Sequence, residues 1–332
     1  MKFGASFGPA PATASLEIAK AADESGFHQL WCFDSHVIWQ DWCTLLGWLV
    51  AQVANPEMQY GTMVTNPVTR DPIVTASAFA TLNEITGGNM ICGIGRGDSV
   101  VRAIKRKPAN LADVEHAVEL IRTLASGDSF TVEETEIDLP WAKGFPRLPV
   151  YVAGYGPKAL TLAGRIADGV IFQVADPYFI EWGLQWVRKG AEEAGREMSE
   201  ITIHCATATF IEPKDQVYDK SRWFPAVVGN HIADVLRHDS SDAMPDELSK
   251  FVEGREGYDY RQHGVAGAEH SKYITDEIVD RFCVIGTEQE CVDKIRHLES
   301  LGVSEFNLYA TFMERGPDVI RQYGEIILPH FA

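Results

Sequence analysis

The stretch that decides the fold is YGTMVTNPVTRDP, residues 60–72, where an apolar run ends in a polar loop and a helix follows. Residues 58–65 are short, apolar and contain β-branched side chains, which predicts a buried strand. The Asn-Pro pair that follows signals a turn. Pro72 fits the first position of a helix, because its missing N–H would have no partner there. The stretch therefore predicts one strand–loop–helix unit, with its helix over residues 72–86.

The same unit recurs along the whole chain. Strands are expected at residues 2–7, 28–33, 58–65, 90–95, 149–153, 169–173, 201–210 and 305–309. Helices are expected at residues 14–25, 41–54, 72–86, 109–125, 157–168, 177–194, 288–300 and 317–327. Alternating strands and helices imply a parallel sheet, and eight units favour its closure into a (β/α)8 TIM barrel. We expect one domain over residues 1–332, with a small hairpin near residues 130–139.

One long segment interrupts this rhythm. Residues 212–280 follow the seventh strand and are polar and rich in histidine. A connection of this length is usually a functional lid or contains helices of its own, and the pieces at residues 232–236 and 247–252 predict two short ones. His263 and His270 lie within this insertion and are candidates for contact with a substrate when a lid closes.

The bulk composition narrows the classes of partner. The chain carries 47 acidic and 29 basic residues, a net charge of -18, and such a surface repels nucleic acid and anionic lipid. Its six cysteines form no C-x-x-C pair, and no cluster of histidines stands at a strand end, so we expect no metal site. No apolar run reaches the length of a membrane span. We expect a cytoplasmic protein that binds a small molecule.

Chemistry-bearing residues gather where the predicted strands end. In a (β/α)8 barrel the active site lies at the carboxyl ends of the strands. The segments after five of the strands are FDSHVIW (33–39), VTNPVTRDP (64–72), GIGRGDS (93–99), AGYGPKAL (153–160) and FQVADP (172–177). Two of them are rich in glycine and several contain Asp or His, so we expect the functional site among these loops.

The two glycine-rich loops differ in what they can bind. GIGRGDS begins like a dinucleotide fingerprint, but that pattern needs a third glycine where Asp98 stands, which argues against NAD. In AGYGPKAL, small residues let a phosphate approach the backbone, and Pro157 begins a helix whose free N–H groups and dipole favour an anion. The candidate phosphate site is therefore Ala153, Gly154, Tyr155, Gly156, Pro157 and Lys158.

Five segments together carry a resemblance to a known family. They are LWCFDSH (30–36), YGTMVTNPVTRDPIVTASAFATL (60–82), GGNMICGIGRGDS (87–99), PVYVAGYGPKALTLAGRIADGVI (149–171) and FCVIGTEQECVDKIRHLESLGVSEFNL (282–308). In this order they resemble the bacterial luciferase-like superfamily. Within it they are most similar to the F420-dependent branch, the methylenetetrahydromethanopterin reductases and their actinobacterial relatives. The resemblance spans nearly the whole chain.

The resemblance implies a luciferase-like barrel and assigns roles to two strand ends. It implies a cis peptide bond between two non-proline residues, Met63 and Val64, which bulges under the tricyclic ring of a cofactor, with Thr65 next to it. It also places the loop of Gly95, Arg96 and Gly97 against the cofactor. An acidic residue near the reacting face of the ring would be Asp98.

The segment FDSH departs from the family pattern. The relatives commonly have Asp followed directly by His, whereas here Asp34 is followed by Ser35 and then by His36. A shift of one residue reverses the direction of a side chain at a strand end. We expect Asp34, His36 and Asp98 to be the catalytic residues that handle protons, and Ser35 to contact the cofactor.

Two cofactors fit this resemblance. Gly154–Pro157 reproduces the G-x-G-P pattern typical of deazaflavin enzymes, whereas FMN-dependent oxygenases more often have serines in this loop. The leading hypothesis is an oxidoreductase that transfers a hydride between coenzyme F420 and a small organic substrate. The alternative is an FMN-dependent monooxygenase supplied by a partner flavin reductase, and a barrel that binds a flavin or fatty acid without turnover is a third. Members of this family commonly form dimers through their second and third helices. The resemblance therefore implies a homodimer through the apolar helices at residues 41–54 and 72–86.

Overall fold

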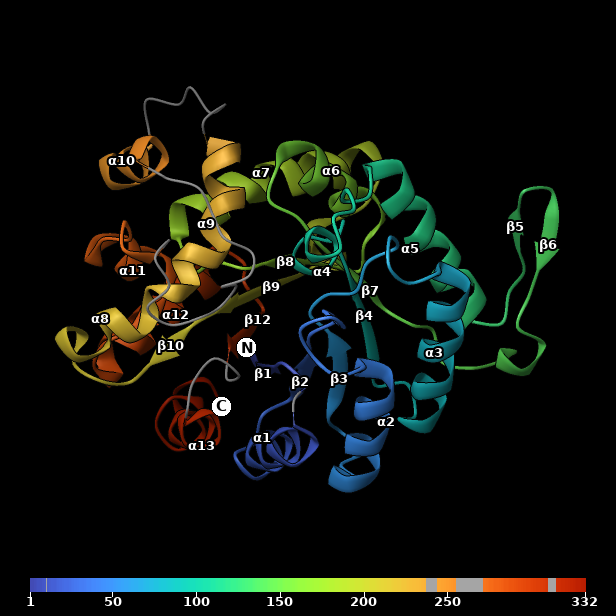
Figure 1. The fold of residues 1–332 in the computed structure, drawn as a ribbon, viewed down its shortest axis with the longest axis horizontal. Helices are drawn as coiled ribbons and strands as arrows, with labels where there is room; N and C mark the ends of the chain where they lie inside the picture. The colour runs from blue at the N-terminus through green and yellow to red at the C-terminus, as the bar shows by residue number, and fades with distance from the viewer. Residues whose placement is uncertain (10, 237–243, 255–270, 310–314) are drawn as a thin grey trace.

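The chain forms a closed barrel of eight parallel strands surrounded by helices (Figure 1). The computed structural model describes residues 1–9, 11–236, 244–254, 271–309 and 315–332. In order around the barrel the strands are β1 (Lys2–Phe7), β12 (Glu305–Tyr309), β9 (Thr202–Thr207), β8 (Gly169–Phe172), β7 (Val150–Ala153), β4 (Met90–Ile94), β3 (Gln59–Thr62) and β2 (Gln29–Cys32). Every neighbouring pair is parallel. The predicted (β/α)8 barrel is confirmed.

The outer helices lie close to where the sequence predicts them. They are α1 (Ala12–Glu24), α2 (Trp42–Val53), α3 (Pro72–Ile85), α5 (Leu111–Ala125), α6 (Pro157–Ile166), α7 (Pro177–Glu193), α12 (Glu288–Ser300) and α13 (Gly316–Ile326). Several begin at a side-chain cap: Asp71 accepts hydrogen bonds from the backbone N–H groups of Ile73 and Val74 at the start of α3. Such caps hold the strand-end loops in place, because each loop ends at a fixed helix start.

The lower part of the barrel interior is filled by aromatic and polar side chains. The ring centroid of Trp31 on β2 lies 4.7 Å from that of His204 on β9. It lies 5.9 Å from the ring centroid of Tyr151 on β7. Glu305 on β12 pairs with His204, with 3.0 Å between Oε2 and Nδ1. All four side chains are buried. These strands stand on different sides of the barrel, so the contacts meet across its interior and fill it.

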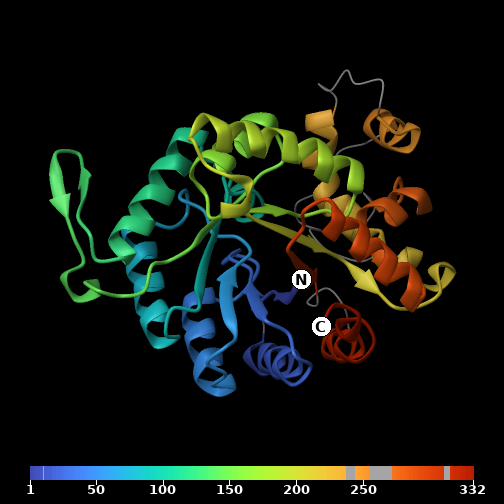
Figure 2. The same cartoon turned by 180° about the vertical axis from the view of Figure 1, so that it is seen from behind.

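A hairpin and the helices of the insertion project from opposite sides of the barrel (Figures 1 and 2). The predicted hairpin is β5 (Phe130–Val132) paired with β6 (Thr135–Ile137), and it projects beyond α3 and α5. The insertion helices gather on the opposite side, as the view from behind also shows.

The insertion after the seventh barrel strand is mainly helical. Its described helices are α8 (Lys214–Ser221), α9 (Trp223–Leu236), α10 (Asp246–Gly254) and α11 (Asp276–Phe282). Helices near residues 232–236 and 247–252 are thus confirmed, although α9 begins nine residues earlier than that pattern suggests. His263 and His270 lie outside the described residues.

The expected strand at residues 201–210 is divided. Its first part is β9 of the barrel, whereas β10 (Thr209–Phe210) leaves the barrel and pairs with β11 (Val284–Ile285). The chain thereby enters and leaves the insertion at one place, since β10 precedes it and β11 follows it. Among the described helices, none is long and apolar enough to cross a membrane.

Candidate functional site

A cavity of about 680 Å³ lies at the carboxyl ends of the barrel strands. Its walls come from the loops after β2, β3, β4, β7 and β8, from the end of β12, and from α9 of the insertion. Of the residues expected from the sequence, the lining includes Asp34, Ser35, Met63, Val64, Gly95, Arg96, Gly97, Asp98, Ala153, Gly154, Tyr155, Gly156, Pro157 and Lys158. The structure therefore brings both glycine-rich loops to one cavity. His36 and Thr65 are not among its lining residues.

The wall after β3 contains the expected cis peptide bond. The bond between Met63 and Val64 is cis, and both residues line the cavity. The N–H of Met63 donates to the carbonyl of Cys32 on β2 at 2.8 Å, and the N–H of Thr65 donates to the carbonyl of Gly93 on β4 at 2.9 Å. Hydrogen bonds to both neighbouring strands thus fix this stretch of backbone at the cavity wall.

The glycines after β4 are explained by close packing and backbone geometry. A Cβ on Gly93 would lie 1.9 Å from the carbonyl oxygen of Thr62, so no side chain fits there. Gly97 has a φ of +83°, which side chains rarely allow. A Cβ on Gly95 would lie 3.1 Å from Cγ2 of Val64, at the cavity wall. These constraints account for the glycines of this loop by packing and backbone conformation.

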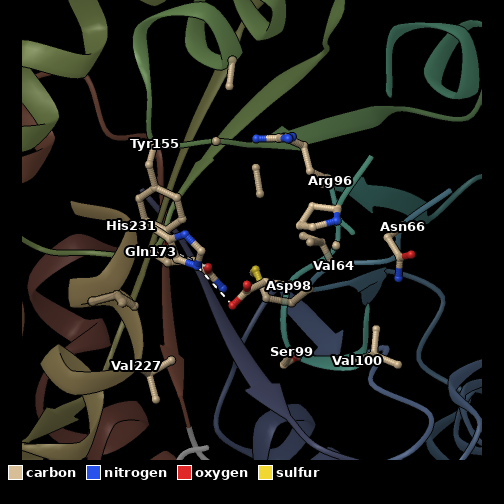
Figure 3. A pocket seen from close by; sticks show the side chains of 18 of the residues that line it. Val64, Asn66, Arg96, Asp98, Ser99, Val100, Tyr155, Gln173, Val227 and His231 are labelled. Carbon is tan, nitrogen blue, oxygen red and sulfur yellow. Dashed lines mark hydrogen bonds and ion pairs between the residues drawn. The ribbon is translucent and has the colours of Figure 1, made fainter. Parts of the chain in front are cut away.

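The loop after β7 presents a helix end to the cavity. Helix α6 begins at Pro157, and its N-cap residue Gly156 provides no side-chain cap. The first N–H groups of a helix need partners from outside it, and they favour an anion. Lys158 is exposed beside them, and Arg96 faces the same space from the β4 loop (Figure 3). These groups form a candidate site for a phosphate.

Asp34 is the centre of a buried hydrogen-bond network. Its side chain is fully buried and accepts hydrogen bonds from Oγ1 of Thr65 at 2.7 Å and from Nε and Nη2 of Arg70 at 2.7 and 3.0 Å. Nδ1 of His36 lies 3.4 Å from the same carboxylate. Arg70 also bonds to Asp41 at 2.8 Å. Both oxygens of Asp34 are therefore occupied by protein groups, and its position suits holding the β2 and β3 loops together.

His36 does not take up the place of the family's histidine in the cavity lining. It stands next to Asp34 with its side chain 28% exposed. Ser35, which precedes it, does reach the lining, and its hydroxyl is 2.9 Å from that of Ser99. The one-residue shift in FDSH therefore turns Ser35 toward the cavity and leaves His36 behind it.

Asp98 is paired with a histidine that the sequence motifs did not reveal. His231 on α9 places Nε2 3.2 Å from Oδ2 of Asp98 (Figure 3). Arg102 donates from Nε to Oδ1 of the same carboxylate at 2.6 Å. Burial alone would raise the pKa of Asp98, but the hydrogen bonds and charges of His231 and Arg102 outweigh it and lower the pKa to about 2. The ring of His231 also stacks on that of Tyr155, with 4.8 Å between centroids.

The remaining lining is neutral or apolar. The hydroxyl of Tyr155 donates to Oε1 of Gln173 at 2.7 Å, and Nε2 of Gln173 donates to the hydroxyl of Tyr309. Burial raises the pKa of both tyrosines well above the usual range, so both hydroxyls stay neutral. Besides His231, α9 contributes a row of apolar side chains: Trp223, Phe224, Val227, Val228 and Val235. In the described part of the chain no group of His, Cys, Asp and Glu could hold a metal ion.

Sequence comparisons place these features among known proteins. The family model for the luciferase-like monooxygenases matches residues 3–305. A 5,10-methylenetetrahydromethanopterin reductase of Archaeoglobus fulgidus is 31% identical over 321 residues, which cover 92% of this chain and 92% of that protein. An F420-dependent glucose-6-phosphate dehydrogenase of Nakamurella multipartita is 27% identical over 346 residues, covering 97% and 93%.

Solved structures share the fold over its full length. The coenzyme F420 dependent tetrahydromethanopterin reductase from Methanopyrus kandleri superposes with a TM-score of 0.78 at 22% identity, covering 100% of this chain and 99% of the other. The oxygenating constituent of 3,6-diketocamphane monooxygenase from Pseudomonas putida, in complex with FMN, gives a TM-score of 0.67 at 17% identity, covering 99% and 98%. At these identities the likeness concerns the fold alone.

Proposed function

Because the chain belongs to the luciferase-like monooxygenase family, we propose that it is an oxidoreductase that transfers a hydride between coenzyme F420 and a small organic substrate. One observation carries the proposal. The loops 93–99 and 153–158 meet at a single cavity, in a chain whose full-length relatives are named as a methylenetetrahydromethanopterin reductase and an F420-dependent dehydrogenase. The substrate class is left open by these names, since they differ from one relative to the next.

The barrel side of the cavity fits a flat ring joined to a phosphate. Backbone at Met63 and Val64 offers a wall for the ring, and Gly95 leaves space where a Cβ would intrude. The uncapped start of α6, with Lys158 beside it, fits the phosphate. F420 has carbon where a flavin has its reactive nitrogen, so when bound it supplies hydride transfer without oxygen activation.

The Asp98–His231 pair fits the proton transfer that accompanies a hydride. With a pKa of about 2, Asp98 is ionised and accepts a hydrogen bond from Nε2 of His231. That bond leaves Nδ1 as the imidazole's remaining proton site, so His231 can take up or release a proton there while Asp98 fixes its orientation. The pair stands beside the apolar side chains of α9 that line this side of the cavity.

A binding experiment tests the cofactor. Purified protein is titrated with F420 and, separately, with FMN, and the fluorescence of each ligand is followed. We expect saturable quenching of F420 at micromolar concentrations and weaker binding of FMN. Tight binding of FMN with no change in F420 fluorescence would refute the proposal.

An FMN-dependent monooxygenase is the second candidate, and one observation favours it. The fold of an FMN-bound monooxygenase matches this chain over nearly its full length. Such an enzyme would receive reduced flavin from a partner reductase. Consumption of oxygen by the protein with chemically reduced FMN and an organic substrate, beyond that of free reduced FMN, would favour this candidate over the first.

We further propose that the protein is a homodimer through α2 and α3. The two helices pack on each other through Trp42 and Phe79, with 4.8 Å between ring centroids, and still expose Trp48, Val74 and Ile85. We expect a dimer in sedimentation velocity at micromolar concentration. Replacing Trp48 and Val74 by lysine should give monomers, whereas the same change at Trp141, an exposed residue outside these helices, should not. A monomeric wild-type protein would contradict the proposal.

A further inference from the structure

Four aromatic side chains gather at one side of the cavity. Trp223 and Phe224 come from α9, Phe33 follows β2, and Tyr309 ends β12. The ring centroid of Tyr309 lies 5.3 Å from that of Phe33 and 5.4 Å from that of Phe224. The centroids of Trp223 and Phe224 are 5.6 Å apart. All four side chains are buried and all four line the cavity, and we call them the aromatic cluster.

Helix α9 joins this cluster to the Asp98–His231 pair. Phe224, Val227, Val228 and His231 recur every three or four residues, so they lie along one face of the helix, and all of them line the cavity. At the rise of an α-helix, Phe224 stands about 10 Å along the axis from His231. A ligand held at His231 and extended along α9 would therefore cross the two valines and reach the aromatic cluster.

This face of α9 is poorly suited to a charged ligand. Residues 223–236 contain no lysine or arginine. Of the cations among the described lining residues, Arg96 and Lys158 stand at the proposed phosphate site, and Arg102 donates to Asp98. A carboxylate or phosphate on the substrate would lose water here without gaining a cation, which is costly. The face therefore favours an uncharged, apolar body.

The histidine at the other end of the face indicates the reacting group. Hydride transfer from carbon, with loss of one proton from the attached oxygen, converts an alcohol into a ketone. His231 provides one site for that proton, and Asp98, 3.2 Å from its Nε2, keeps the ring oriented. One acid–base group at the end of an apolar face matches an alcohol joined to an apolar body.

We propose that the substrate is an uncharged alcohol, or the ketone formed from it, whose hydroxyl meets His231 and whose aromatic ring enters the aromatic cluster. The inference rests on the proposed function, since F420 is taken as the hydride acceptor. Aromatic rings gain from edge-to-face and offset contacts with one another beyond the area they bury. The cluster offers such contacts about 10 Å along α9 from the reacting end.

The proposed reaction balances in hydride and proton. The C–H bond of the alcohol carbon breaks, and the hydrogen leaves with the electron pair to the bound deazaflavin, which is reduced by two electrons. The O–H bond breaks, its proton goes to Nδ1 of His231, and its electrons complete the carbon–oxygen double bond. The ketone, the reduced cofactor and a protonated His231 result, and the reverse sequence reduces the ketone.

Three matched alcohols test the body of the substrate. In 4-phenyl-2-butanol, 2-butanol and 4-hydroxypentanoate the reacting carbon is the same, and the chain carries an aromatic ring, no further group or a carboxylate. Reduction of F420 is followed by its absorbance. We expect kcat/KM for the phenyl compound to exceed that for 2-butanol about tenfold or more, since the ring is buried among other rings. The carboxylate should react more slowly than 2-butanol.

Binding without the cofactor gives an independent readout. The protein free of F420 is titrated with 4-phenyl-2-butanone and with butanone in a calorimeter. We expect the ketone that carries the ring to bind about tenfold more tightly, because the aromatic cluster belongs to the protein itself.

A charge placed on the face of α9 should reverse the preference. Val227 lines the cavity and is half-buried, so in Val227→Arg a cation can stand among the apolar side chains. We expect the ratio of kcat/KM for the phenyl compound to that for the carboxylate to fall about a hundredfold. Gln185→Arg adds the same charge at an exposed position of α7 and should leave the ratio unchanged. Circular dichroism checks the fold of each variant.

A second variant keeps the face uncharged. Phe224→Leu removes one ring of the aromatic cluster while conserving an apolar side chain of similar size. We expect it to bind 4-phenyl-2-butanone about threefold more weakly than wild type does and to bind butanone equally.

The outcomes separate this proposal from the proposed function. If F420 binds but the three alcohols react equally, react in the opposite order or do not react, the substrate proposal is overturned and the cofactor stands. Equal binding of the two ketones would overturn it as well, as would an unchanged ratio in Val227→Arg. If F420 does not bind, the proposed function fails, and this substrate fails as part of it.

Discussion

The two walls of the cavity are built differently. The barrel wall consists largely of backbone: the cis bond at Met63–Val64, the glycines of the β4 loop and the uncapped start of α6. The wall from α9 consists of side chains: one histidine among aromatic and aliphatic residues. On the proposed function, the first wall holds the cofactor and the second faces the substrate.

The difference teaches how such a site divides its tasks. Backbone groups can contact a ring and bind a phosphate, and this requires only that the side chains around them are small. A wall of side chains on an inserted helix can change its shape and polarity without disturbing the barrel hydrogen bonds. Variants placed on one wall should therefore affect the cofactor or the fold, and variants on the other should spare both.

The largest effect is expected from Asp34, which holds the barrel wall together. Asp34→Ala removes a buried carboxylate and leaves Arg70 and Thr65 without their partner, so we expect a loss of about 4 kcal/mol in the free energy of unfolding. Urea denaturation measures it. Asp41→Asn, at the exposed partner of the same arginine, should cost less than about 1 kcal/mol. Similar losses in the two variants would contradict the central role given to Asp34.

A smaller effect is expected at the cofactor's proposed place on the barrel wall. Gly95→Val adds a side chain that meets Val64, and it should weaken F420 binding about a hundredfold, or about 2.7 kcal/mol. The matched change on the other wall is Val227→Ala on α9, for which we expect less than a twofold effect. A loss of F420 binding in Val227→Ala would contradict the assignment of the cofactor to the barrel wall.

The third effect concerns the pair that joins the walls. Because the pKa of Asp98 in the folded state is about 2, below its unfolded value, the ionised carboxylate stabilises the fold above pH 4 and loses this effect as the pH falls from about 4 to 2. We expect Asp98→Asn to be about 2 kcal/mol less stable than wild type at pH 7. The difference should shrink toward zero near pH 2, and a constant difference in denaturation curves across this range would disprove the assignment.

The sequence predicts the barrel wall far better than the other one. Strand-end loops such as GIGRGDS and AGYGPKAL are local patterns, and the barrel topology alone brings them together at the carboxyl ends of the strands. The cis bond at Met63–Val64 could be placed because the resemblance covers that strand. His231 could not be predicted as a site residue, because its pairing with Asp98 depends on how α9 packs over the barrel mouth. The sequence also predicts only the last residues of α9.

The surroundings of Asp34 and His36 depend on contacts between loops that a sequence motif does not contain. The motif predicts that Asp34 lies close to the site, and in the structure Asp34 is among the residues that line the cavity. Its hydrogen bonds to Thr65 and Arg70 come from the neighbouring loop and are invisible in a linear pattern. The position of His36 likewise could not be predicted without the backbone path of the loop, which turns Ser35 toward the cavity.

The packed layer of Trp31, Tyr151, His204 and Glu305 has a consequence for traffic through the protein. It fills the lower part of the barrel interior, so ligands reach the cavity from the side of the strand ends. On the proposed function, a cofactor against the barrel wall and a substrate beside α9 therefore share one side of approach. The packed layer thus decides from which end of the barrel the reaction can be supplied.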